Sequence, residues 1–173
     1  MSEALAIRSL QAPDLADYKV LRERVLGDAP EAFTSDAAEE SLKIAQGYLA
    51  RLGLDQPEGS QFTLGAWRAG QLVGALTCQG ETRVKGRHIG HIAGMMVCAQ
   101  ARGQGVGRGL LAACLARARR TAGLELLTLS VTSNNRAAIH LYQQAGFKCY
   151  GTLVRAIKIG ADYHDKDLMV LNL

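Results

Sequence analysis

The spacing of hydrophobic and polar residues along the chain predicts alternating strands and helices. Short apolar runs bounded by turn-forming residues favour strands, whereas apolar residues three and four positions apart favour helices. The expected strands cover residues 5–10, 61–68, 71–78, 88–97, 126–131, 147–155 and 168–173. The predicted order is a strand, two helices, three strands, a helix, a strand, a helix and two strands.

The first two helices are expected in the N-terminal third of the chain. Pro13–Asp14 begins the first helix, because proline is favoured in a first helical turn. Asp36, with Glu39 three residues later, resembles a capping box that begins the second helix. The apolar stripe of this second helix, which should end near Gly53, consists of Ala38, Leu42, Ala45, Leu49 and Leu52.

Glycines mark turns and irregularities in the expected strands. Ala69–Gly70 separates two strands and suits a two-residue hairpin turn. Gly90 and Gly94 lie inside the strand 88–97, which indicates a bulge or a close backbone approach.

A glycine-rich loop joins the strand 88–97 to the third helix, which begins near Val106. Four glycines occur within residues 103–109, where they remove side chains from a backbone that must come close to something. The first N–H groups of the helix have no partner within the helix, and the helix dipole makes that end positive. Such a loop suits an anion, most often phosphate, and Arg102 and Arg108 add fixed positive charge beside it.

Three kinds of phosphate loop can be distinguished by their residues. A Walker loop needs Gly-Lys-Ser/Thr, but Gly107 is followed by Arg108. A dinucleotide fingerprint needs G-x-G-x-x-G, and the last position falls on Arg108 or Leu110. The third pattern, Arg/Gln-x-x-Gly-x-Gly/Ala, matches residues 102–107.

Composition is typical of a soluble globular protein. The 173 residues suffice for one domain over residues 1–173, with 48% apolar and 21% charged residues. The net charge of +4 suits an anionic ligand but does not require nucleic acid, and the few aromatic residues argue against a single-strand binding platform. We therefore expect no nucleic-acid partner.

Cysteine spacing and hydropathy bear on metal binding and location. Cys78, Cys98, Cys114 and Cys149 form no C-x-x-C pair and no zinc-ligand cluster, so we expect no metal and four free, mostly buried thiols in a reducing compartment. The sequence contains no signal-peptide pattern before its first strand and no apolar run of membrane-spanning length. These features predict a cytoplasmic protein that does not enter membranes.

A second motif surrounds the fourth helix and completes a family resemblance. Ser133–Asn134 is expected to cap this helix, Gly146 to end it, and its inner side to carry Ala138, Leu141, Tyr142 and Ala145. The block is Asn134-Asn135-x-x-Ala138-x-x-Leu141-Tyr142-x-x-x-Gly146-Phe147. With the loop and the element order, it resembles the GCN5-related N-acetyltransferase (GNAT) family. The resemblance implies an α/β fold with a mixed, mostly antiparallel sheet of six or seven strands, a splayed parallel pair and about four helices.

The resemblance also implies an activity. A GNAT enzyme transfers the acetyl group of acetyl-CoA to a primary amine by direct attack in a ternary complex, without metal. The acceptor would be a small amine or a protein N-terminus or lysine, and the protein a monomer or homodimer. The alternative is a non-catalytic acyl-CoA-binding or interaction module on the same fold.

The resemblance further assigns binding residues. The backbone of the loop would hold the pyrophosphate, through Arg102, Gly103, Gln104, Gly105, Val106, Gly107 and Arg108. Backbone groups of Met95, Met96 and Val97 would pair with the pantetheine arm, and an N–H there would polarise the thioester. Two roles fit Asn135 equally well, a bond to pantetheine and a helix cap.

The resemblance offers one candidate for the general acid and several for the base. Tyr142 matches the general acid of the family, since a phenol with a pKa near 10 stays protonated, although a core tyrosine is the competing interpretation. The base is open: His91 is the candidate on the strand, with His88, Glu31, Glu39 and an ordered water as alternatives. The acceptor pocket is expected from the first two helices and residues 79–87 and 155–167.

Overall fold

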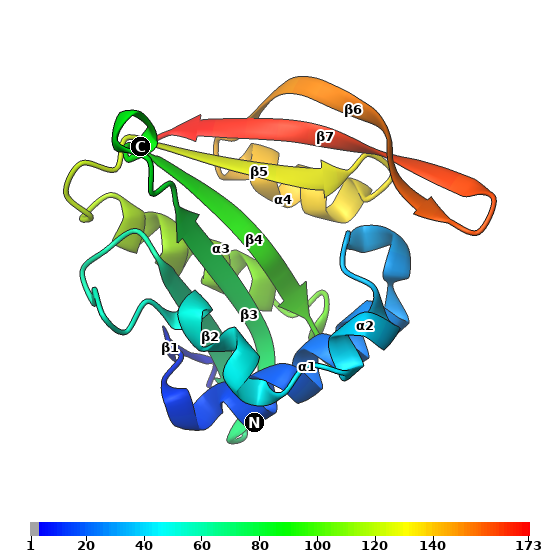
Figure 1. The fold of residues 1–173 in the computed structure, drawn as a ribbon, viewed down its shortest axis with the longest axis horizontal. Coiled ribbons are helices and arrows are strands. Elements are labelled where there is room, and N and C mark those ends of the chain that lie inside the picture. Colours follow the sequence, from blue (N-terminus) through cyan, green and yellow to red (C-terminus); the bar gives the residue numbers. More distant parts are fainter. Residues whose placement is uncertain (1–3) are drawn as a thin grey trace.

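The fold is built on a twisted seven-stranded sheet (Figure 1). The computed structural model describes residues 4–173, and the strand order is β1-β2-β3-β4-β5-β7-β6. The strands are β1 (Ala6–Ser9), β2 (Phe62–Arg68), β3 (Gln71–Gly80), β4 (Ile89–Val97), β5 (Leu126–Thr132), β6 (Lys148–Ile159) and β7 (Asp162–Asn172). Neighbours are antiparallel except β4 and β5, which are parallel. The expected mixed, mostly antiparallel sheet is therefore confirmed.

Helices cover both faces of the sheet (Figure 1). They are α1 (Leu15–Asp28), α2 (Ala37–Ser41), α3 (Val106–Ala118) and α4 (Arg136–Gln144), with a 3₁₀ segment, η3 (Ala45–Leu52). α3 packs on β2 and β3, and α1 with η3 covers the opposite face of the same strands. The fully buried side chains Leu10, Leu76, Leu110 and Leu127 show that apolar burial holds these layers together.

The parallel strands β4 and β5 separate part of the way along their length (Figure 1). They pair from Ile89 to Ile92 of β4, beyond which β4 stays with β3 and β5 stays with β7. Just past this point Gly94 and Met95 together stand opposite Leu76, and Gly94 has a φ of +60°. The predicted bulge is thus present, and it lies where the two strands part.

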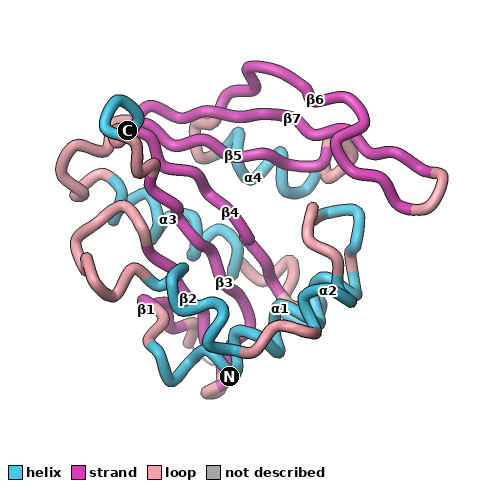
Figure 2. Tube along the Cα trace, viewed as in Figure 1, coloured by secondary structure: helices cyan, strands magenta, loops and turns pink. Residues whose placement is uncertain are grey.

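The expected single helix over residues 36–53 is wrong. Asp36 does cap α2, accepting hydrogen bonds from the N–H groups of Ala38 and Glu39, but α2 has only five residues and a loop separates it from η3 (Figure 2). Leu42 and Leu49, which were expected on the inner stripe, are 85% and 46% exposed. Leu52 is buried as expected, but Glu40 and Tyr48 also face inward, so a polar cluster replaces part of the apolar stripe.

Three smaller expectations also need correction. The last two strands extend beyond residues 155 and 168 and meet in a hairpin at Gly160, because their polar outer halves carry no apolar pattern. The cap of α4 is Asn135 rather than Ser133–Asn134, since the Asn135 side chain accepts from the Ala138 N–H at 3.2 Å. Cys149 is exposed, whereas the other three cysteines are buried; all four are free.

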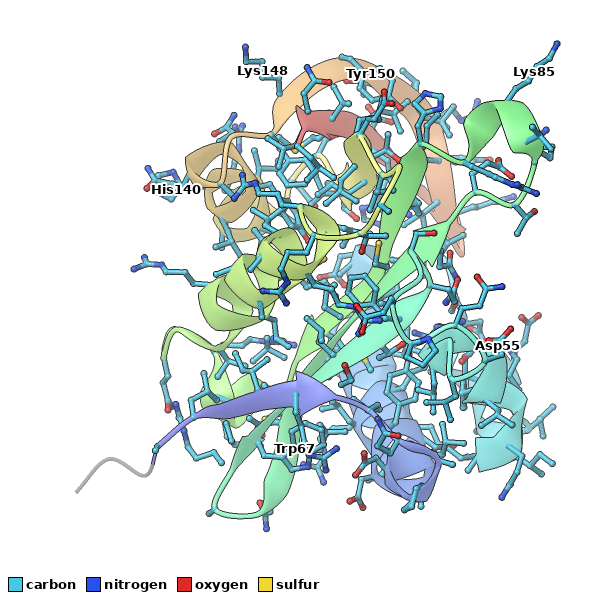
Figure 3. All side chains as sticks on the ribbon, turned by 90° about the vertical axis from the view of Figure 1, so that its left-hand side faces the viewer. Asp55, Trp67, Lys85, His140, Lys148 and Tyr150 are labelled. Atoms are coloured by element: carbon cyan, nitrogen blue, oxygen red, sulfur yellow. The ribbon has the colours of Figure 1, made fainter. Side chains whose placement is uncertain are left out.

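The two sheet edges lie at opposite ends of the molecule. Trp67 of β2 lies beside the edge strand β1, and Lys148 and Tyr150 lie on the other edge strand, β6 (Figure 3). The Arg8 guanidinium stacks 3.7 Å from the centre of the Trp67 ring. The separation of β4 from β5 is therefore central in the sheet, far from either edge.

A buried ion pair joins α1 to α2. Arg22 Nε lies 2.5 Å from Glu40 Oε2, and the Tyr48 hydroxyl donates to the same oxygen at 2.7 Å. Burial alone would raise the pKa of Glu40, but hydrogen bonds from Arg22, Lys43 and Tyr48 outweigh it and lower that pKa to about 2. The cluster needs Glu40 to be ionised.

Acid should therefore destabilise the fold through Glu40. Because the folded pKa is lowered from 4.5 to about 2, the stabilising contribution is complete above pH 4.5 and is lost as the pH falls toward 2. A shift of this size corresponds to about 3 kcal/mol. Urea unfolding of the wild type and Glu40→Gln between pH 2 and 7 should show a stability difference that shrinks below pH 4.5. Glu39→Gln, on the exposed side of α2, is the matched control; a difference for Glu40→Gln that does not change with pH would contradict this account.

Candidate active site

A groove of about 1240 Å³ lies beside the place where β4 leaves β5. Its walls come from the end of β4, the glycine-rich loop, α3, α4 and the connection that follows α1. The last of these includes the 3₁₀ segment η2 (Pro30–Ala32) and Phe33. The groove therefore borders elements on both faces of the sheet.

The glycine-rich loop provides the positive end of the groove. Gly103 and Gly105 have φ values of +72° and +81°, a conformation that costs other residues roughly 1–2 kcal/mol. Gly105 is the cap residue of α3, and no side chain within residues 4–173 hydrogen-bonds to the first turn there. The N–H groups at the start of α3 are therefore free to bind an anion, as the sequence predicts.

Two further glycines in the first turns of α3 have a packing role that the sequence did not reveal. A Cβ on Gly107 would lie 3.1 Å from Met95 Cε and 3.4 Å from Leu141 Cδ2. A Cβ on Gly109 would lie 2.8 Å from Ile7 Cδ1. Gly103 and Gly105 have positive φ and open space around them, so their role beside a ligand stays a prediction, whereas Gly107 and Gly109 let α3 pack closely.

The polar side chains of the loop hold its shape. Arg102 Nε donates to the Val97 carbonyl at 3.2 Å, and Gln104 Nε2 donates to the Gln100 carbonyl at 2.7 Å. Arg102 and Arg108 line the groove together with Gly103, Gly105, Val106 and Gly107. Gln104 is absent from the lining, so a contact through its backbone stays a prediction.

The end of β4 presents to the groove a backbone edge on which the Val97 carbonyl accepts from Arg102 Nε. Met95, Met96 and Val97 all line it, and no strand among the described residues pairs with them on the side toward β5. The side chains of Met95 and Val97 approach Gly107 of α3, whereas Met96 is buried. A ligand that carries amide groups can complete this edge as an added strand does.

Tyr142 brings a proton donor to the same place. Its side chain lines the groove, and its ring packs edge-on against Phe147 at 5.9 Å between centres. The hydroxyl donates to Met95 Sδ at 3.3 Å, and a thioether is only a weak acceptor. Burial raises the pKa of Tyr142 to about 12, so the hydroxyl is protonated at neutral pH and available to a better acceptor.

Asn135 also lines the groove, next to α4. Of its two expected roles, the helix cap is the one present, since its Oδ1 accepts from Ala138. The side-chain NH₂ group remains for a ligand.

The candidate bases are spread over the molecule. His91 is exposed and outside the groove lining; its Nδ1 lies 3.0 Å from Thr128 Oγ1. Partial desolvation and the positive charge of Lys166 lower the pKa of His91, which favours its neutral form. Glu31 lines the groove, while His88 and Glu39 do not. A catalytic role for His91 stays a prediction.

Metal binding and membrane crossing find no support in the side chains and helices of residues 4–173. This part of the chain contains no group of three or more His, Cys, Asp or Glu side chains placed to hold a metal ion. None of its helices combines the length and apolarity needed to cross a membrane.

Comparison with known proteins assigns the chain to a family. A mycothiol acetyltransferase of Salinispora arenicola is 29% identical over 150 residues, which are 85% of this chain and 46% of that protein. The chain spans less than half the length of the curated relatives that it matches. The structure of a GNAT-family acetyltransferase from Streptococcus pneumoniae superposes with a TM-score of 0.87 at 25% identity, covering 98% of this chain and 99% of that one. The yncA protein of Salmonella typhimurium, solved with its cofactor acetyl-CoA, has a TM-score of 0.79 at 23% identity, covering 98% and 94%. The model of the acetyltransferase (GNAT) family matches residues 22–147, and the chain belongs to this family.

Proposed function

We propose that this protein transfers the acetyl group of acetyl-CoA directly to a primary amine held in the same complex. The observation that carries the proposal is the groove, in which an uncapped helix start, an unpaired strand edge and a buried phenol lie together. Family membership and the acetyltransferase relatives support the same chemistry.

The loop and the start of α3 would hold the pyrophosphate. The N–H groups of Val106, Gly107 and Arg108 point out of the first turn, and Gly103 and Gly105 leave the backbone open to a large anion. The guanidinium groups of Arg102 and Arg108 add long-range attraction.

The end of β4 would hold the pantetheine arm. Its amides would pair with the backbone edge of residues 95–97, exchanging for the Arg102 contact at the Val97 carbonyl, and this would place the thioester beside the opening between β4 and β5. A backbone N–H in this segment would stabilise the negative charge that develops on the thioester oxygen.

Tyr142 would supply the proton that the leaving thiolate needs. The phenol stays protonated because its pKa is raised, and the weak contact with Met95 is easily exchanged for a sulfur anion. The amine must lose a proton before it attacks, and water, Glu31 or His91 would accept it.

The pyrophosphate assignment can be tested with a matched pair of glycines. Gly105→Ala should weaken acetyl-CoA binding at least tenfold in calorimetry, because a methyl group would enter the space that the anion needs. Gly123→Ala is the control, since Gly123 also has a positive φ, +77°, with open space around it, but lies outside the groove. Equal affinity in the two folded variants would contradict the placement.

Tyr142→Phe tests the general acid. The variant keeps the ring packing and loses only the donor, so kcat should fall by about 10²–10⁴-fold while acetyl-CoA affinity stays within a few-fold. A thioester with a more acidic leaving thiol should lose less. Tyr150→Phe, at an exposed residue of β6, is the control. Full turnover by Tyr142→Phe would remove this role, and acetyl-CoA binding without transfer to any amine would favour the non-catalytic module.

A further inference from the structure

Two arginines meet at the bulge of β4, on the face opposite α3. A Cβ placed on Gly94 would lie 3.6 Å from Arg22 Nη1 and 3.8 Å from Arg51 Nη1. Arg22 comes from α1 and Arg51 from η3, which cover this face of the sheet. Because Gly94 immediately precedes Met95, both guanidinium groups lie next to the proposed position of the thioester.

The positive charge there exceeds the negative charge available to it. Arg22 uses Nε for Glu40 and Nη2 for Ser35, and its Nη1 has no hydrogen-bond partner in the part of the chain described. Arg51 Nη1 donates to the Tyr18 hydroxyl at 3.3 Å, and Arg51 forms no ion pair within residues 4–173. Glu40 is already shared between Arg22 and Lys43, so the charge of Arg51 is uncompensated.

A third cation lies across the opening. Lys166 of β7 donates to Thr34 Oγ1 at 2.6 Å and forms no ion pair with the described carboxylates. Thr34 directly follows Phe33, which lines the groove. Positive groups therefore border the opening from α1, η3 and β7.

The arginine pair lies close to the groove lining along β4. Val25, three residues after Arg22 on α1, lines the groove, and the pairing of β4 with β5 has ended before Gly94. A molecule held by the arginines beside Gly94 would lie one residue from Met95, which lines the groove.

We propose that the acceptor is a free α-amino acid whose carboxylate binds Arg22 and Arg51 beside Gly94. This inference rests on the proposed acetyl transfer and specifies its acceptor. Guanidinium groups match carboxylates in shape and charge, and the near-complete burial of Arg22 strengthens such bonds. One carbon separates the carboxylate from the amine in an α-amino acid, so an anion at Gly94 leaves the amine near residue 95, about 3.8 Å further along the backbone. A lysine side chain has no anion at that distance from its amine.

The test compares each of the common L-amino acids with its carboxamide as acceptor. We expect acetylation of amino acids, with kcat/KM at least tenfold lower for the matching amide. Arg51→Gln should raise KM for the amino acid at least tenfold, leave KM for the amide within about twofold, and leave acetyl-CoA affinity unchanged. Arg24→Gln, which removes the same charge from the exposed side of α1, should change none of these values. Arg51 is chosen because loss of Arg22 would leave Glu40 buried without its partner.

Several results would overturn the inference and leave the proposed transfer intact. One is an equal kcat/KM for amides and amino acids, and another is a preference for peptide N-termini over free amino acids. The third is an equal change of KM for the amino acid and its amide in Arg51→Gln. Acetyl-CoA binding with no amino acid acetylated would overturn it as well. Failure to bind acetyl-CoA would instead overturn the proposed function itself, so the two failures are distinguishable.

Discussion

The functional features of this protein depend on the loss of pairing between two parallel strands. β4 and β5 share hydrogen bonds only as far as Ile92, and a bulge at Gly94 and Met95 follows at once. Backbone N–H and C=O groups beyond that point must find other partners, because unpaired polar groups are costly away from water. The edge of β4, where Arg102 satisfies the Val97 carbonyl, is stable at the surface of a groove, and a ligand with amides can complete it.

Local sequence patterns predicted several residues that line one side of the groove, while the roles of these residues stay predictions. Residues 102–107 and Tyr142 are recognisable because a strand-to-helix turn and one face of a helix are each formed by residues close together in the sequence. The bulge at Gly94 was expected because glycine interrupts a strand. Gly107 was harder to interpret: its Cβ position is closed by Met95 and Leu141, which are distant in sequence, so local reasoning assigned it to the ligand.

The opposite side of the site could not be predicted from local patterns. Arg22, Glu40 and Arg51 lie in three separate segments and read as surface residues on helical stripes. Arg22 and Glu40 are buried as an ion pair, and the expected helix is interrupted between α2 and η3. Strand pairing and buried charge are tertiary properties, and the polar ends of β6 and β7 were missed for the same reason.

The contact between Tyr142 and Met95 places an oxidisable thioether beside the proposed acid. The Met95 sulfur faces the groove and accepts a hydrogen bond from the phenol. Peroxide would convert this thioether to a sulfoxide, whose oxygen is a far stronger acceptor and a bulkier, polar group. The hydroxyl of Tyr142 would then be held by its neighbour, and methionine sulfoxide reductase would be the kind of enzyme able to release it.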